Sequence, residues 1–267
     1  MSNGAQTEHT RGRSLRFATA PVNWNNDDIP DWRPHVPFPD ILDRMREAGY
    51  TATEYGANFP NSADSLRREL AQRSLVLCGA YQWLPLRDHD RLSRQLEELE
   101  PRMRLLQETA CEHLIIADIL TPERVALAGQ VPADGSQSLD ARHFQEMADG
   151  IALVAARARP FGLRVHVHNH VGTYVETAWE VAALAAVMDP SHADFCFDTG
   201  HYAYGGGDPG TFVRENADRI GYVHLKDVAP EVLSDARRQR QSFLDALRRV
   251  IFCRIGEGVV DIPAILA

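Results

Sequence analysis

The 267-residue sequence predicts an α/β fold, a (β/α)8 TIM barrel in which we find no eighth strand. Short apolar runs alternate with longer amphipathic stretches through seven strand candidates, and this spacing indicates right-handed βαβ units around a parallel sheet. The first βα junction lacks the GxGxxG loop of a dinucleotide-binding open sheet. Seven repeats in about 215 residues therefore fit a barrel better than an open sheet.

The first half of the chain supplies four strand candidates and the helices between them. We predict strands at 16–24, 51–56, 75–84 and 113–120 and helices at 37–50, 62–74 and 89–110. In the first helix Ile41, Leu42 and Met45 have helical spacing, and Gly49 can end the helix. A polar insertion at 129–139, which carries glycine and proline, follows the fourth strand.

The second half continues the alternation and then changes character. We predict helices at 140–162, 178–188 and 208–217 and strands at 164–170, 193–203 and 220–228. The following segment, 230–252, has an apolar stripe and five arginines. The stripe is Leu233, Phe243, Leu244 and Leu247, and the arginines are Arg237, Arg238, Arg240, Arg248 and Arg249. For each arginine taken singly, a solvated basic face is the more usual interpretation. Pro263 suits the start of a last helix.

Composition and charge limit the partners. The chain has 28 Lys and Arg against 37 Asp and Glu, a net charge of -9, which disfavours nucleic acid or an anionic membrane as the main partner. No apolar run is long enough to cross a bilayer and no signal-peptide core is present, so we expect a cytoplasmic protein. We expect residues 1–14 to form a disordered tail and 15–267 a single domain. The four scattered cysteines are best interpreted as small buried thiols.

Three histidines alternate along the predicted strand at 164–170, which reads RVHVHNH. His166, His168 and His170 share one face because side chains alternate along a strand. The valines between them suit the helix-facing side, so the histidines should point into the barrel. We expect His166, deepest in the strand, to be a hydrogen-bonded core residue, and His168 and His170 to belong to a site at the strand end.

Two further strands end in polar side chains. FCFDTGH offers Asp198 and His201, and YVHLKDV offers His224, Lys226 and Asp227. A carboxylate and imidazoles from adjacent strand ends give the mixed oxygen and nitrogen ligands that suit Mn²⁺, Co²⁺, Fe²⁺ or Zn²⁺. A divalent-metal site at the barrel mouth is therefore the leading hypothesis. The alternative is a polar mouth held by hydrogen bonds between histidines and carboxylates, without an ion.

Several motifs along the chain resemble one family. They are RFATAPVNWNNDDIPDW, AGYTATEYG, HNHVGTYVET, CFDTGHYAYGGGDP, VHLKDV and IGEGVVDIPAIL. Together they are similar to the xylose-isomerase-like TIM barrels of the sugar phosphate isomerase/epimerase superfamily, and within it most similar to the inosose (2-keto-myo-inositol) dehydratases. The resemblance runs from Arg16 to the last residue. HLKD and GEG recur across the superfamily and say little about substrate.

The resemblance implies a divalent metal, most often Mn²⁺ or Co²⁺ with Zn²⁺, Fe²⁺ or Mg²⁺ as alternatives, held by Glu, Asp, His and Glu from strands five to eight. By position the Asp is Asp198, the His is His224, and the first Glu falls on His168, with Glu176 as an alternative first ligand. The fourth ligand belongs to an eighth strand, and Glu257 comes too early to be that residue. We therefore expect a truncated or seven-stranded barrel that binds metal weakly and associates into homo-oligomers.

The resemblance also implies enolate chemistry on a polyol or keto-sugar, which needs a base, an acid and a metal. For proton transfer we single out Glu54, His201 and Lys226, and for substrate binding Asn23, Trp24, Gln82 and His170. Structural alternatives stay open. Glu54 can pair with a basic residue, His201 can cap the following loop, Lys226 can bridge to Asp227 and Trp24 can simply pack.

Three functions stay open at this point. The first is a metal-dependent lyase that dehydrates a keto-inositol or a related keto-sugar. The second is an isomerase or epimerase on a ketose or keto-sugar, because that reaction needs the same enolate. The third is a catalytically silent barrel that binds a sugar or a partner subunit. The family also places an insertion before its last βα unit, so we expect 230–252 to overlie the barrel mouth as a lid.

Overall fold

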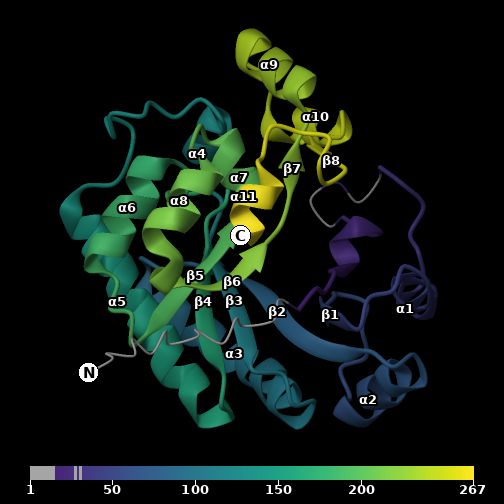
Figure 1. The fold of residues 1–267 in the computed structure, drawn as a ribbon. Helices are drawn as coiled ribbons and strands as arrows, with labels where there is room; N and C mark the ends of the chain where they lie inside the picture. Colours follow the sequence, from purple (N-terminus) through teal and green to yellow (C-terminus); the bar gives the residue numbers. More distant parts are fainter. Residues whose placement is uncertain (1–15, 27–28, 30–31) are drawn as a thin grey trace, which may run out of the picture.

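Six parallel strands in sequence order form the curved sheet of a TIM-barrel-like half-barrel in the computed structural model, which describes residues 16–26, 29 and 32–267 (Figure 1). The strands are β1 (Ala52–Tyr55), β2 (Val76–Leu84), β3 (His113–Asp118), β4 (Arg164–His168), β5 (Ala193–Asp198) and β6 (Ile220–His224). The tail predicted at residues 1–14 lies outside the described residues.

The strand predicted at 16–24 is wrong in extent. Only Thr19 makes a parallel bridge, to Thr53 of β1. Pro21–Asn23 forms the 3-10 helix η1 instead. Proline has no backbone N–H to give to a sheet, so the chain turns at Pro21. The first segment of the sheet is therefore a single bridge beside β1.

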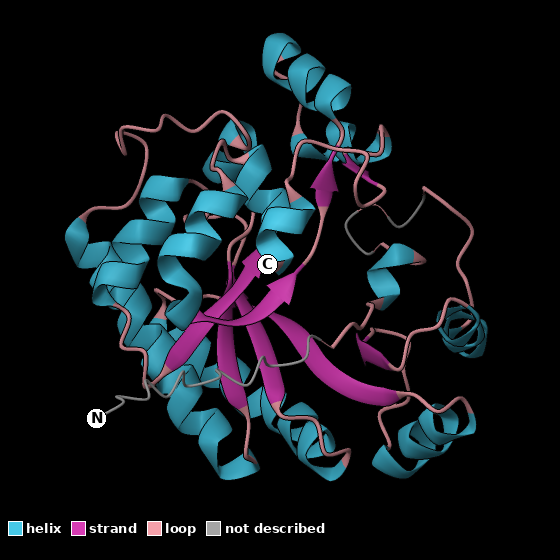
Figure 2. Ribbon diagram, viewed as in Figure 1, coloured by secondary structure: helices cyan, strands magenta, loops and turns pink. Residues whose placement is uncertain are grey.

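The long helices follow one another around the outside of the sheet (Figure 2). They are α1 (Phe38–Glu47), α2 (Ala63–Gln72), α3 (His89–Glu108), α5 (Ala141–Ala158), α6 (Ala178–Val187) and α8 (Pro209–Asn216), with the short elements α4 (Pro122–Leu127), α7 (Thr199–Tyr204), η2 (Arg159–Phe161) and η3 (Ala217–Arg219). The predicted apolar face of α1 is confirmed, because Ile41, Leu42 and Met45 are fully buried. Polar caps start several helices, and at α6 Thr177 and Glu180 form a capping box.

Strands β3 and β4 end two residues earlier than predicted, and β5 and β6 end four or five residues earlier. β5 stops at Asp198 rather than residue 203, because the Asp198 side chain accepts the His201 N–H and starts helix α7. β6 stops at His224 rather than residue 228, and β7 (Asp227–Val228) pairs antiparallel with β8 (Phe252–Cys253). Both changes turn the chain at the carboxyl ends of the strands, where the polar residues gather.

The C-terminal segment forms a second apolar cluster beside the strands' carboxyl ends (Figure 1). It contains α9 (Pro230–Gln239), α10 (Phe243–Arg248) and α11 (Ile262–Leu266). Of the predicted stripe, Leu233, Phe243 and Leu247 are buried, whereas Leu244 is 37% exposed, which corrects that position. Buried Asp227 accepts backbone N–H groups of Val228, Gly256, Gly258 and Val260 at 2.8 to 3.0 Å, so the turn before α11 is tied to β7.

Among the described residues, no helix combines the length and apolar character that crossing a membrane requires.

Candidate metal centre and active site

Asp198, the last residue of β5, is the centre of a buried polar cluster at the barrel mouth. Its Oδ1 accepts the backbone N–H of His201 at 2.8 Å. Its Oδ2 lies 3.2 Å from His168 Nε2 and 3.8 Å from His224 Nδ1, and Lys226 Nζ contacts the same oxygen. The carboxyl ends of β4, β5 and β6 thus converge on one carboxylate oxygen.

The neighbours of Asp198 fix its charge. Burial alone raises the pKa of this carboxyl, but Lys226, His201 and His168 outweigh burial and hold the pKa well below its usual value. Burial lowers the pKa of His168 to about 4, so its imidazole is neutral at pH 7, which is the form that binds metals. A buried carboxylate beside a neutral imidazole supplies the oxygen and nitrogen ligands that suit a divalent cation.

Glu54 and His224 form the second pair of the cluster, from β1 and β6. His224 Nε2 lies 2.7 Å from Glu54 Oε1, and Glu54 is buried. Burial raises the pKa of Glu54, yet His224 outweighs it and lowers the pKa overall. Burial lowers the pKa of His224, but Cys196 and Glu54 raise it well above the usual value. A carboxylate that holds the far nitrogen of a histidine is the usual support of a metal-binding imidazole.

Two hydrogen bonds assign tautomers to His201 and His224. The Val171 N–H donates to His201 Nδ1 at 3.2 Å, so neutral His201 carries its proton on Nε2. His224 carries a proton on Nε2 toward Glu54, and its Nδ1, the atom near Asp198, becomes a lone-pair donor once a metal displaces the second proton. His201 Nε2 therefore offers a hydrogen-bond donor to the cluster, whereas His224 Nδ1 offers a lone pair once its proton is displaced.

Ligand atoms of His168, Asp198 and His201 lie within 4.8 Å of one another, and all three residues are buried. The predicted metal set has His224 where this group has His201. Because His201 Nδ1 accepts an amide and Nε2 carries the proton, His201 is the poorer ligand of the two in this arrangement. The structure thus brings both candidates to the site and gives a chemical reason to prefer His224.

Lys226 does not bridge to its neighbour Asp227, so that alternative is wrong. Its Nζ contacts Asp198 and lies 5.2 Å from the centre of the Phe252 ring. The Asp227 carboxylate is occupied by backbone amides. The structure therefore places the Lys226 ammonium inside the cluster.

Aromatic rings enclose the imidazoles. The His170 and His201 rings are 3.8 Å apart between centroids, and Phe243 of α10 lies 5.5 Å from His201 and 6.1 Å from His170. On the β2 side, Tyr81 lies 5.3 Å from His168 and Trp83 lies 4.8 Å from His170. The predicted position of 230–252 over the mouth agrees with the Phe243 contacts.

Gln82 lies on the opposite face of β2 from Tyr81 and Trp83, because strand side chains alternate. Its amide donates to the Trp83 carbonyl at 3.1 Å. Gln82 was predicted to bind substrate and Trp83 was not, because the inward face of β2 follows from the pairing of Glu54 with Gly79, which only the structure shows. The role of Gln82 stays a prediction, and the structure brings its two neighbours to the histidines.

The other predicted substrate residues lie in and just after η1. Asn23 is exposed and donates to Thr19 Oγ1 at 2.9 Å. Trp24 is partly buried and packs against the main hydrophobic core, as the packing alternative for this residue expects. Their roles toward substrate stay predictions.

Glu176 faces backbone amides rather than Asp198. Its two carboxylate oxygens accept the N–H groups of Gly129 at 2.7 Å and Gly172 at 2.6 Å. This arrangement disfavours Glu176 as the alternative first metal ligand.

The interpretation of His166 as a core residue agrees with the structure. The side chain is fully buried, and its Nε2 lies 2.9 Å from His113 Nδ1. Burial lowers the pKa of His166 to about 3, so the ring is neutral. His166 therefore belongs to the barrel floor and not to the mouth.

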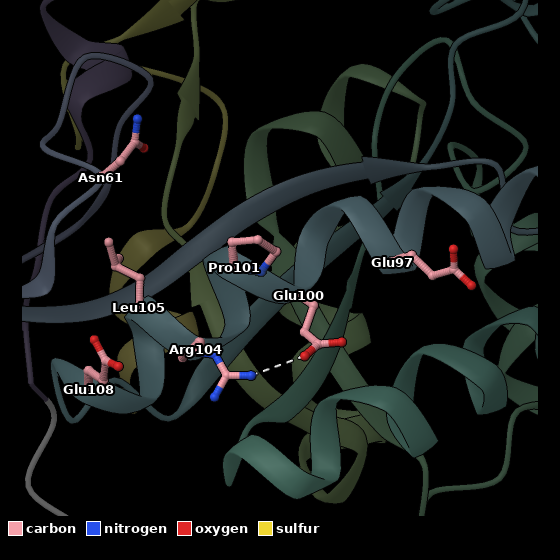
Figure 3. A pocket seen from close by; sticks show the side chains of 7 residues that line it. All are labelled: Asn61, Glu97, Glu100, Pro101, Arg104, Leu105 and Glu108. Carbon is pink, nitrogen blue, oxygen red and sulfur yellow. Dashed lines mark hydrogen bonds and ion pairs between the residues drawn. The ribbon is translucent and has the colours of Figure 1, made fainter.

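A cavity of about 430 Å³ lies beside α3, and no histidine lines it (Figure 3). Asn61 and one face of α3, including Glu97, Glu100 and Glu108, line it. Arg104 forms a 3.1 Å ion pair with Glu100 there. Carboxylates on an open helix surface are ordinary solvated groups. The cavity beside α3 therefore does not compete with the barrel mouth as the candidate site.

Comparison with known proteins confirms the resemblance. The amino-acid sequence matches the profile of the family described as Xylose isomerase-like TIM barrel over residues 42–267. The chain belongs to this family. The protein named Inosose dehydratase of Geobacillus kaustophilus is 34% identical over 258 residues, which cover 95% of this chain and 82% of that protein. The Rhizopine catabolism protein MocC of Rhizobium meliloti is 34% identical, covering 95% of this chain and 77% of its own length.

Solved structures of this fold are similar at low sequence identity. The probable 3-DHS dehydratase AsbF of Bacillus anthracis superposes with a TM-score of 0.69 at 15% identity and covers 94% of this chain and 88% of its own. The IOLI protein, solved with a zinc atom, gives a TM-score of 0.65 at 12% identity and covers 94% of this chain and 83% of its own. At these identities the likeness shows the shared fold alone.

Proposed function

We propose that this protein is a metal-dependent hydro-lyase that dehydrates a keto-inositol or a related keto-sugar. The observation that supports it most is the convergence of His168, His224 and Lys226 on Asp198 Oδ2 at the carboxyl ends of the strands, where barrels of this kind carry their chemistry. The 34% identity to a protein named Inosose dehydratase supports the substrate class.

His168, Asp198 and His224 are the residues that would hold the ion, with Glu54 fixing His224 from behind. Two imidazoles and a carboxylate suit Mn²⁺, Co²⁺ or Zn²⁺. When bound, the ion supplies Lewis-acid stabilisation of negative charge developing on the substrate.

The chain's own side chains supply the proton transfers. The Glu54 carboxylate keeps Oε1 on His224 Nε2 and takes the proton from the carbon next to the ketone with its other oxygen, and the electrons of that C–H bond form the new C=C bond. The adjacent C–O bond breaks, and the Lys226 ammonium gives its proton to the departing hydroxyl, which leaves as water. A later proton transfer from Glu54 to Lys226 restores both groups.

His170 and His201 position the substrate in this proposal. The Nε2 proton of His201 is a hydrogen-bond donor for a substrate oxygen, because Nδ1 is occupied by the Val171 amide. His170 stacks on the same ring. Trp83 and Phe243 offer flat apolar surfaces to the C–H groups of a polyol ring.

The test is to incubate the protein and Mn²⁺ with 2-keto-myo-inositol and to follow the ultraviolet absorbance of the conjugated product. We expect absorbance to grow with the wild type but not with Asp198→Asn. Arg104→Ala, on the remote α3 cavity, is the control and should behave as the wild type. Circular dichroism checks that each protein is folded. No absorbance, with exchange of a substrate proton into solvent on a ketose, would favour an isomerase or epimerase. Neither signal would favour a binding barrel.

A further inference from the structure

The loop between β4 and α6 is held by one buried carboxylate. Glu176 accepts the Gly172 N–H at 2.6 Å and the Gly129 N–H at 2.7 Å, and its side chain is buried. Gly172 and Gly129 have φ angles of +83° and +76°, where an L side chain is strained. Two turns, one after α4 and one after β4, therefore direct an amide group toward Glu176.

Arg124 of α4 holds the same loop from a second direction. This buried guanidinium donates to the Thr173 carbonyl at 2.8 Å, to the Gln137 carbonyl at 3.1 Å and to the Glu180 carboxylate at 3.0 Å. It lies 3.8 Å from Glu176. A buried guanidinium without partners is costly, so Arg124 favours conformations that keep these contacts. The contacts tie the 122–139 segment to the loop.

The loop reaches the site through Val171. The Val171 N–H donates to His201 Nδ1 at 3.2 Å, and the Val171 carbonyl lies 2.7 Å from His170 Nδ1. Gly172, which Glu176 holds, is the next residue. A shift of this turn would move the Val171 amide away from the imidazole and leave His201 without the partner that fixes its tautomer.

We propose that Glu176 is a positioning residue that, by holding the Gly172 amide, presents the Val171 N–H to His201 Nδ1 and keeps the His201 proton on Nε2. The use of that proton to bind a substrate oxygen rests on the proposed function, whereas the tautomer itself does not. Glu176 acts through the loop and does not touch the substrate.

The test is Glu176→Gln, which keeps the size of the side chain but offers only one oxygen to two amide donors. We expect nitrogen-15 NMR of histidine-labelled protein to show His201 losing its single Nε2–H tautomer. Turnover should fall about tenfold, as expected for one lost hydrogen bond of ordinary strength, while Mn²⁺ affinity stays unchanged. Glu97→Gln is the control for the chemical change alone, because Glu97 is exposed on α3 beside the remote cavity.

The outcomes separate the two proposals. An unchanged His201 tautomer in Glu176→Gln, or the same change in Glu97→Gln, overturns the positioning role. If Glu176→Gln fails to fold, Gly172→Ala strains the same turn without changing charge and should alter the tautomer in the same way. A wild type that shows the Nε2–H tautomer but does not dehydrate a keto-inositol contradicts the proposed function and leaves the positioning role standing.

Discussion

His201 and His224 are the two candidates for the third ligand of the proposed metal site, beside His168 and Asp198. His201 lies near both of them, but its Nδ1 accepts an amide and its Nε2 carries the proton. His224 presents Nδ1 to Asp198 Oδ2 while Glu54 holds its other nitrogen. The direction of each ring, set by one hydrogen bond, decides which imidazole can donate a lone pair.

We therefore predict that His224→Ala weakens Mn²⁺ binding about 100-fold or more, since even the loss of a supporting partner costs up to that much. His201→Ala should keep the affinity and lose turnover. Isothermal titration of both variants with Mn²⁺ measures the difference. The reverse ranking would make His201 the ligand.

Asp118 at the end of β3 gives a pH prediction outside the site. The residue is 1% exposed, Oδ1 accepts the Leu86 N–H at 3.3 Å, and Arg87 Nε lies 3.6 Å from Oδ2 and partly offsets the effect of burial. Burial is the largest cause that raises the pKa of Asp118, from 3.8 to about 6. Between these pH values the folded protein holds a proton that the unfolded chain has released.

The free energy of unfolding should consequently fall as pH rises from about 4 through about 6, with Asp118 contributing at most about 3 kcal/mol. Asp118→Asn keeps the shape and cannot ionise, so its curve should be flatter in this window. Urea unfolding of both proteins at several pH values measures the slopes. Parallel curves would show that Asp118 does not titrate in this range.

At the scale of elements, α10 links the C-terminal cluster to the site. Phe243 is buried against the His170 and His201 rings, whereas the next residue, Leu244, is 37% exposed. Removing a buried aromatic side chain costs about 3 kcal/mol or more, so Phe243→Ala should loosen the 230–252 segment. Leu244→Ala is the matched control and should behave as wild type.

Limited proteolysis checks both variants. We expect cleavage within 230–252 to be faster in Phe243→Ala than in the wild type or Leu244→Ala, and slower in the wild type when Mn²⁺ and the keto-inositol are present. Equal cleavage with and without ligand would contradict a lid role for this segment.

The sequence predicted a strand well where the two-residue alternation of its side chains decides which of them face the barrel. The alternation of His166, His168 and His170 placed one residue in the core and two at the mouth. The strand that holds Asp198 was predicted to run on to residue 203, because the capping of α7 by Asp198 depends on a side-chain hydrogen bond that periodicity does not encode.

Contacts between distant parts of the chain were harder to predict. Glu54 and His224 are 170 residues apart, and Glu176 meets Gly129 from 47 residues away. These pairings arise only when βα units close on one another, so the sequence offered the residue types and not their partners. Glu176 was consequently taken as a candidate ligand, although its amide contacts give it another role.

At the scale of the whole molecule, the half-barrel brings the ends of β4 and β6 to the buried carboxylate that ends β5, and β1 joins through Glu54, which contacts His224. The central claim is that this convergence binds a divalent ion through Asp198. Titrating the full chain with Mn²⁺ and measuring bound metal tests it most directly, with Asp198→Ala beside the wild type and folding checked for both. We predict a single saturable site in the wild type that Asp198→Ala abolishes. No saturable binding in the wild type, or equal binding in the variant, would contradict the account.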